Sequence, residues 1–257
     1  MPSSKKSQET KDANVRGEIA RQLDMFAELL VKNQIILDSS PLNKAAAQCR
    51  MNNTTGTWKY SLENLLFRRL GEFKTFQNKF DIQNASLELS VVIEGSCNET
   101  NENDPLNTLV LDIVITGLYE GEEDADSACA AWHLDRHIYD ENSEEPEFAH
   151  PIYHFSFGGI HLEKTQNPLS TSVLLVDTPR LAHPPMDAIL GVDFVLTNFI
   201  GLSLSSVRSD TFYINTVGTM QQRLWKPYVN SLQSFWVSGT QVSSWNPLLI
   251  WTQLLTL

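Results

Sequence analysis

Two segments in which large apolar residues recur at every second position limit the folds that are open to this chain. The first segment has Leu87, Leu89, Val91 and Ile93, and the second has Leu109, Leu111, Ile113 and Ile115. Successive side chains of a strand point to opposite faces of a sheet, so each segment predicts a strand with one buried face. The linker between the two segments is rich in turn-forming residues such as Asn103, Asp104 and Pro105. We therefore expect these strands in a mainly antiparallel meander.

The same rule predicts a second pair of strands that carries most of the histidines. One strand, at about 129–138, would bury Trp132, Leu134 and Ile138 and show His133, Asp135 and His137 on its other face. The next strand would bury Tyr153, Phe155 and Phe157 and show His150, His154 and Ser156. A fifth strand is expected over residues 172–176.

Helices are expected before the strands. From about Val15 to Leu37, apolar residues recur at spacings of three and four, which is typical of an amphipathic helix. A short helix is expected at 43–50. Another is expected to begin after Ser61 and to end near residue 80.

Two more helices are expected after the strands. The segment 185–200 is apolar on nearly every side, which predicts a central helix, and its only charged residues are Asp187 and Asp193. A buried carboxylate needs a partner. The segment 216–236 predicts a last helix with a kink at Pro227.

These elements predict an α+β fold. We expect a mainly antiparallel sheet of four to five strands, with N-terminal helices and with C-terminal helices packed on one face. Residues 1–12 are expected to form a disordered tail, and 13–257 a single domain. Its parts would be a helical region at 13–80, a sheet at 86–176, a second helical region at 184–236 and an uncharged, Trp-bearing stretch at 237–257.

Charge and cysteine content limit the partners and the compartment. The formal net charge is -12, and residues 97–148 hold fifteen acidic residues against the single basic residue Arg136. Such a field repels phosphate backbones, so broad nucleic-acid binding is not expected. The chain begins without an apolar signal-peptide core and has no segment that would span a membrane, so we expect a cytoplasmic protein. Three cysteines without paired spacing favour reduced thiols.

The C-terminal part suggests a protein partner. Residues 227–257 contain no charged side chain but include Trp236, Trp245 and Trp251. Either this stretch folds back over the sheet or it docks onto another chain, and the second alternative includes a homo-oligomer.

The histidine strands are the candidate functional site. Zinc and similar divalent metals bind imidazole nitrogens and carboxylate oxygens, so His133, Asp135, His137, His150 and His154 are candidate metal ligands. The sequence does not name the cofactor. Acid/base chemistry without a metal is the alternative, because one imidazole can take a proton while a second donates one. A structural or partner-facing role for the cluster is the third interpretation.

The segment Pro179 to Pro185 is a second candidate. Arg180 and His183 lie where the chain enters the apolar helix, and a cation with backbone N–H groups can hold an anion there. The alternative is a rigid, proline-locked connection. In the first case, Arg180 and His183 would join His133, Asp135, His137 and His154 as catalytic candidates.

Short motifs narrow the function further. No glycine-rich phosphate loop, dinucleotide fingerprint, paired CxxC or HExxH helix is present. His150-Pro151-Ile152, within the order helix, meander, His-Pro segment and helix, resembles the His-Pro-Asn region of ubiquitin-conjugating (E2-like) domains. Ile160 and His161 stand where that family has its catalytic cysteine, so this resemblance implies binding without conjugation.

The histidine-rich strand pair followed by a helix with Asp193-Phe194 is also similar to small bacterial toxins of toxin–antitoxin pairs. Neither resemblance assigns a functional residue. The sequence thus predicts a hydrolase of nuclease-like type, with or without a metal. The alternative is a non-enzymatic, partner-binding subunit of a larger complex, E2-like in fold.

Overall fold

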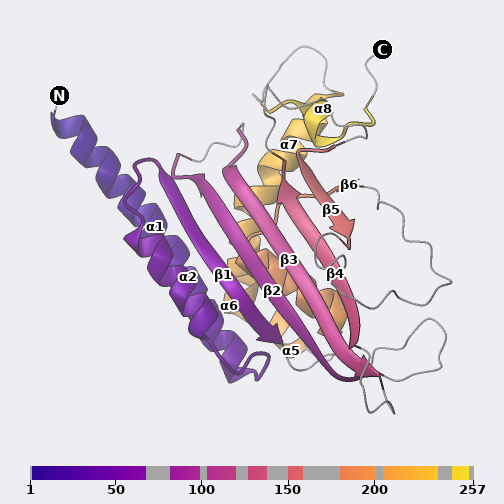
Figure 1. The fold of residues 1–257 in the computed structure, drawn as a ribbon. Coiled ribbons are helices and arrows are strands. Elements are labelled where there is room, and N and C mark those ends of the chain that lie inside the picture. The colour runs from indigo at the N-terminus through magenta and orange to yellow at the C-terminus, as the bar shows by residue number, and fades with distance from the viewer. Residues whose placement is uncertain are drawn as a thin grey trace.

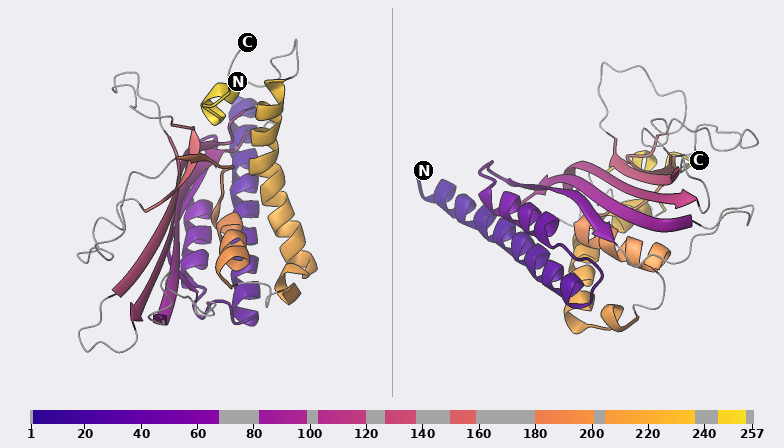
Figure 2. Two further views of the ribbon diagram at one scale, coloured as in Figure 1. Left: turned by 90° about the vertical axis from the view of Figure 1, so that its right-hand side faces the viewer. Right: turned by 60° about the horizontal axis from the view of Figure 1, so that its bottom comes forward.

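The computed structural model shows an α+β fold built on one six-stranded antiparallel sheet (Figure 1). The structure describes residues 2–67, 82–98, 103–119, 127–137, 150–158, 180–200, 205–236 and 245–254. The strands follow one another in sequence order across the sheet, and the helices gather on one side of it (Figure 2). The predicted fold class is confirmed, with one strand more than expected.

The strands form a continuous meander. They are β1 (Thr57–Phe67), β2 (Ile82–Ser96), β3 (Leu106–Tyr119), β4 (Ser127–Arg136), β5 (Tyr153–Phe157) and β6 (Leu181–Ala182). In the β2–β3 pair Leu89 lies opposite Ile113, and Val91 lies opposite Leu111. All four side chains are completely buried, as the alternation predicted. The strand expected at 172–176 lies outside the described residues.

The helices come from both ends of the chain, before and after the strands in sequence. They are α1 (Pro2–Lys32), α2 (Ser40–Met51), α4 (Ala188–Val195), α5 (Ser205–Arg208), α6 (Thr211–Met220), α7 (Lys226–Ser234) and α8 (Pro247–Ile250). Two π-helical segments, η1 (Leu196–Ile200) and η3 (Gln221–Trp225), continue α4 and α6. Within the described residues, no helix combines the length and the apolar character needed to cross a membrane.

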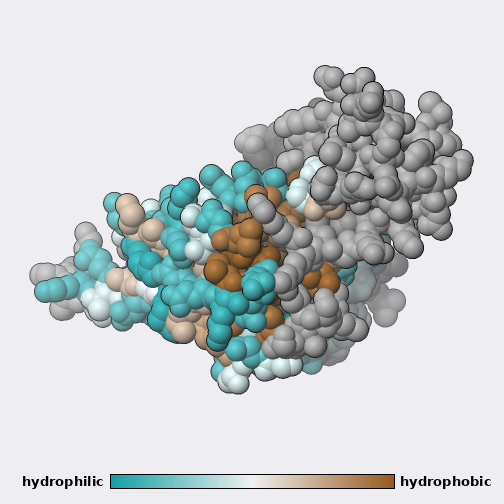
Figure 3. Space-filling view, turned by 90° about the horizontal axis from the view of Figure 1, so that it is seen from below, coloured by the Kyte–Doolittle hydropathy of each residue, from teal (hydrophilic) through white to brown (hydrophobic). Residues whose placement is uncertain are grey.

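The apolar core lies between the sheet and these helices. Its largest fully buried side chains come from α1, from α2 and the loop before it, and from β1, β2 and β5. From below, apolar residues gather in the middle of the surface, and hydrophilic residues border them on the side toward the N-terminus (Figure 3).

Residues 57–67 form strand β1, so the helix predicted after Ser61 was wrong. A β-bulge explains the error. Leu62 lies opposite Val91 and Leu65 lies opposite Leu89, so β1 has one residue more than β2 between these pairs. The extra residue puts two buried leucines three positions apart, which resembles helical spacing. Asn64 takes a left-handed conformation with φ of 52° at the bulge.

Helix α1 begins at Pro2, so most of the expected disordered tail is helical. Tertiary contacts hold these first turns. The Asp12 side chain is buried, and its Oδ2 atom accepts a hydrogen bond of 2.6 Å from the backbone N–H of Gly56. Gln8 donates to Asp12 and to Asn98. Composition alone does not reveal such contacts, because they come from distant parts of the chain.

The two carboxylates of the apolar helix have partners, as expected. Asp187 is the N-cap of α4 and accepts a hydrogen bond of 2.9 Å from the N–H of Leu190. Its burial raises the pKa of the carboxyl to about 6, although the backbone donors act in the opposite direction. Asp193 accepts hydrogen bonds from the Tyr213 hydroxyl and from Arg208.

The predicted irregularity at Pro227 takes the form of a π-helical segment. Proline has no N–H, and its ring clashes with the carbonyl group four residues earlier, here that of Arg223. The helix widens at η3 directly before Pro227 and continues as α7.

The uncharged C-terminal stretch packs only in part. Trp245 and Ile250 are buried in the core, and Leu249 accepts a hydrogen bond of 2.7 Å from the N–H of Ile152 beside β5. Trp236 and Trp251 remain 64% and 43% exposed. Trp245 and Ile250 therefore favour a stretch that folds back onto the protein. The exposed Trp236 and Trp251 favour docking onto another chain.

Gly95 of β2 lets Trp58 and Pro105 approach the strand closely, and replacing it should be costly. A Cβ atom there would lie 2.4 Å from the ring of Trp58, which is almost completely buried, and 2.9 Å from the carbonyl oxygen of Pro105. We expect Gly95→Ala to lower the free energy of unfolding by about 1–3 kcal/mol, measured by urea denaturation. Gly17→Ala in α1, where nothing lies within 4 Å, should instead raise it by about 0.5–1 kcal/mol. Equal effects would contradict this account.

Candidate acid/base site on the helix-free face

The strand register brings the predicted histidine face together. His133 of β4 lies opposite Asp112 of β3, and Asp135 of β4 lies opposite His154 of β5. Leu134, between His133 and Asp135, is completely buried on the side of the helices. Because side chains alternate along a strand, His133 and Asp135 lie on the face that no described helix covers.

Four side chains form a chain of alternating acidic and basic groups. The Nδ1 atom of His133 lies 2.7 Å from Oδ1 of Asp112, and its Nε2 atom lies 3.4 Å from Oδ2 of Asp135. The other oxygen of Asp135 lies 2.8 Å from Nε2 of His154. Asp135 therefore links two imidazole rings from neighbouring strands.

Two further histidines extend this chain through ring contacts. The ring centroid of His150 lies 4.5 Å from that of His154 in an edge-on arrangement. The ring of His137 lies 3.8 Å from that of His150. The backbone places His137 and His150 together, because the N–H of His137 donates to Ile152 beside the start of β5. The four histidines predicted on the two strands thus lie together. His161 lies outside the described residues.

The carboxylates make His133 a strong base. The hydrogen bond that His133 donates to Asp112, followed by its contact with Asp135, raises the pKa of His133 to about 9, against an opposing effect of burial. Burial by itself would raise the pKa of Asp135. The neighbouring imidazoles of His133 and His154 outweigh it and hold that pKa well below the usual range. At neutral pH this part of the cluster is an ion pair of imidazolium and carboxylate.

At the other end of the cluster, the surroundings lower the pKa values of the histidines. Burial, together with the neighbouring rings of His137 and His154 and the charge of Arg180, lowers the pKa of His150 to about 4. Burial also lowers the pKa of His137, to which His154 and Arg180 contribute. Both rings are therefore neutral at pH 7.

Histidine titrations should separate these two environments. In NMR spectra of protein with labelled histidines, we expect the His133 ring to titrate near pH 9 and the His150 ring near pH 4. Stability should follow with a definite sign. The contribution of His133 is complete below its ordinary pKa of 6.5 and is lost as the pH rises through 9. His150 destabilises the fold as the pH falls from 6.5 toward 4. Two titrations near 6.5 would contradict the described environments.

The contacts leave little room for the metal site that the sequence suggested. A metal needs several donors whose lone pairs converge on one point. Here both nitrogens of His133 face carboxylate oxygens, and Nε2 of His154 faces another. No group of three or more His, Cys, Asp or Glu side chains among the described residues could hold a metal ion. The five candidate ligands instead contact one another.

Arg180 and His183 separate in the structure. Arg180 is exposed next to β6, and its charge acts on His137 and His150, which places it beside the cluster. His183 lies on the side of the core, where its ring centroid is 5.4 Å from that of Phe155 and 6.3 Å from that of Phe194. Of these two residues, Arg180 acts on the histidine cluster and His183 packs against aromatic rings of the core.

The sequence analysis missed Asp112 and the depth of His154. Asp112 is the one carboxylate among the alternating residues of β3, and only the register shows that it faces His133. His154 was expected on an open face but is 4% exposed, and its Nδ1 atom lies 3.3 Å from the carbonyl oxygen of Pro151.

A second buried group anchors these strands from the side of the core. The hydroxyl of Tyr153 donates to Asp104, with a separation of 2.5 Å, and the Nε atom of Arg136 donates to the other oxygen of the same carboxylate at 2.9 Å. Tyr153 and Arg136 are cross-strand partners. The Asp104 carboxylate therefore locks the β4–β5 register that aligns the histidines on the opposite face.

No family model, no curated protein and no solved structure matches the chain.

Proposed function

We propose that this chain is a hydrolase that uses metal-free acid/base chemistry on the helix-free face of its sheet. One observation carries the proposal: within a single connected cluster, His133 lies between the carboxylates of Asp112 and Asp135, whereas His150 packs against the rings of other histidines. These surroundings raise the pKa of His133 to about 9 and lower that of His150 to about 4. Pairs of titratable groups whose environments separate their pKa values are typical of an acid and a base that work together.

The roles follow from these protonation states. His150 is neutral at pH 7, so an unprotonated ring nitrogen takes a proton from the attacking water. His133 is an imidazolium, and the longer of its two carboxylate contacts is the one of 3.4 Å between Nε2 and Asp135. We assign the Nε2–H as the proton that goes to the leaving group, while Nδ1 stays bound to Asp112. Asp112 and Asp135 keep His133 charged, and Asp135 also orients His154 against the ring of His150. Arg180 lies beside the cluster. Its positive charge lowers the pKa of His150, whereas the negative charge of Asp135 raises it.

The test uses two chromogenic probes in the presence of EDTA: p-nitrophenyl butyrate for carboxylic esters and bis-p-nitrophenyl phosphate for phosphodiesters. We expect turnover of one probe, with a rate that is flat between about pH 4 and about pH 9. His150→Ala and His133→Gln should each lower it by about 10²–10⁴-fold. Glu88→Gln, a carboxylate change on β2, is the matched control. No turnover of either probe, or equal turnover in all variants, would overturn the proposal.

A partner-binding role is the second candidate, and the exposure of Trp236 and Trp251 favours it. Deleting the C-terminal stretch would not test this role, because Trp245 and Ile250 belong to the core. The sharper test is the double variant Trp236→Ser and Trp251→Ser, studied by sedimentation over a wide concentration range. Self-association that this variant loses supports a homo-oligomer. A wild-type chain that stays monomeric throughout contradicts it.

A further inference from the structure

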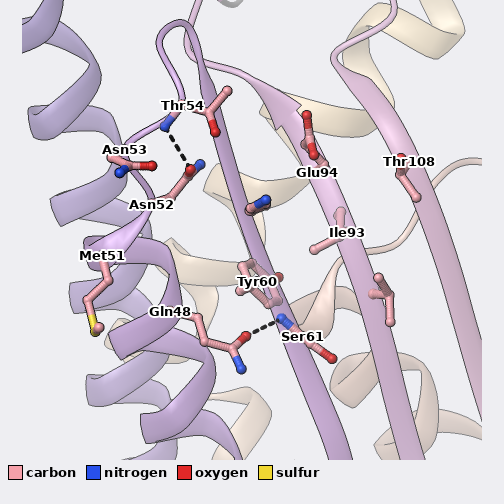
Figure 4. A pocket seen from close by; sticks show the side chains of 12 residues that line it. Gln48, Met51, Asn52, Asn53, Thr54, Tyr60, Ser61, Ile93, Glu94 and Thr108 are labelled. Carbon is pink, nitrogen blue, oxygen red and sulfur yellow. Dashed lines mark hydrogen bonds between the residues drawn. The ribbon is translucent and has the colours of Figure 1, made fainter.

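A pocket of about 510 Å³ lies between the end of α2, the turn that follows it, and strands β1 to β3 (Figure 4). Its lining residue Val92 shares a cross-strand row with Asp135 of the histidine cluster, two strands away on the same face of the sheet. Residues that line it are Gln48, Met51, Asn53, Lys59, Val92 and Glu94. Its size is typical of pockets that bind small molecules. Nothing in the proposed hydrolase uses it.

The wall of this pocket is held in place from behind. The guanidinium of Arg16 in α1 donates to the carbonyl groups of Asn52, Thr54 and Thr57, and the side chain is almost completely buried. Asp12 accepts from the N–H of Gly56 in the same turn. The pocket is therefore formed before any ligand arrives, which lowers the entropy cost of binding.

The floor of the pocket is fixed as well. Oε1 of Gln48 accepts a hydrogen bond of 2.7 Å from the backbone N–H of Ser61, so the side-chain amide of Gln48 points across the pocket toward β1 (Figure 4). Its Nε2 group remains a donor at the pocket wall. The apolar lining is unusually open, since Met51 is 79% exposed and Val92 is 48% exposed.

Two opposite charges stand side by side on this floor. Lys59 of β1 and Glu94 of β2 are direct cross-strand partners, which places their Cβ atoms about 4.5–5.5 Å apart. The ion pairs among the described residues do not include one between them. Within the described part of the chain, Glu94 accepts a long hydrogen bond of 3.5 Å from Asn107. Lys59 and Glu94 thus place a positive and a negative charge side by side, next to apolar side chains. This arrangement is complementary to a ligand that carries an anionic and a cationic group close together.

We propose that this pocket binds a free α-amino acid with a large apolar side chain. The carboxylate of the ligand meets Lys59 and the Nε2 group of Gln48, and its ammonium group meets Glu94. Its side chain covers Met51 and Val92. The ligand is neutral overall, as is the Lys59–Glu94 pair that receives it. This inference is independent of the proposed hydrolase and stands or falls separately.

Isothermal titration calorimetry with L-leucine and L-tryptophan tests the proposal. Glycine, N-acetyl-L-leucine and L-leucinamide each remove one recognised feature, and we expect each to bind at least about tenfold more weakly. Lys59→Met and Glu94→Gln should weaken binding of the best amino acid by a similar factor. Lys44→Met on α2 and Glu88→Gln on β2 are matched controls that should leave it unchanged.

A second readout locates the ligand. With methyl-labelled methionine, the NMR signal of Met51 should shift on titration, whereas the buried Met186 and Met220 should not. Three results would overturn the proposal: no saturable binding, binding of the blocked derivatives as tight as that of the free amino acid, or binding that leaves the Met51 signal in place.

Discussion

Replacing Asp135 by asparagine should have the largest effect on the proposed chemistry. Both oxygens of this carboxylate face imidazole nitrogens, so an amide would turn an N–H group toward a ring N–H group. We expect the pKa of His133 to fall from about 9 toward its ordinary value, because one of its two carboxylate partners is lost. We also expect hydrolysis of the responsive probe to fall by about 10²–10⁴-fold. Histidine NMR titration and the chromogenic assay measure the two effects.

Asp112→Asn provides the matched comparison. This variant also removes a carboxylate from His133 but leaves the contact between Asp135 and His154 intact. The pKa of His133 should fall in both variants. The NMR chemical shifts of the His154 ring should change only in Asp135→Asn, because only Asp135 contacts that ring. Unchanged titrations in both variants would show that the carboxylates do not control the cluster.

Arg16→Met should have the largest effect on stability. One buried guanidinium satisfies three backbone carbonyl groups of the turn between α2 and β1, and it also lies 4.0 Å from the buried carboxylate of Asp12. Methionine fills similar space but leaves the carbonyl groups and the carboxylate without this donor. We expect the free energy of unfolding, measured by urea denaturation, to fall by about 3–5 kcal/mol.

Arg21→Met is the control on the same helix. Arg21 pairs with Glu18 at 2.7 Å, but both side chains are about half exposed. An exposed pair of this kind contributes little to stability, because solvent screens the two charges. If Arg21→Met destabilised the protein as much as Arg16→Met, burial of Arg16 would not be the cause.

Most of the fold could be predicted from the spacing of apolar residues. The strands β2 to β5 and the helices around Leu23 and Val192 keep a regular period, and the structure has them where the period indicated. Strand β1 could not be recognised, because the bulge at Asn64 changes the period from two to three between Leu62 and Leu65. The start of α1 depends on Asp12 reaching a turn that lies far along the chain.

The site could be predicted in part. A period of two placed His133 and Asp135 on one face and His154 on the same face of the next strand, and the register confirms that they meet. The sequence could not show that Asp112 would face His133, since this depends on the β3–β4 register. The sequence also could not show that the ring of His183 would pack against Phe155. His183 follows directly after the two-residue strand β6, which was not predicted.

The contact between Gln48 and Ser61 has a consequence for how copies of this chain meet. Strand β1 is at the edge of the sheet, and an edge strand offers unpaired N–H and C=O groups to any strand from another molecule. Here helix α2 lies along β1, and a side-chain amide occupies one of these N–H groups. Intermolecular strand addition at β1, a common first step in amyloid-like aggregation, would have to displace a helix first.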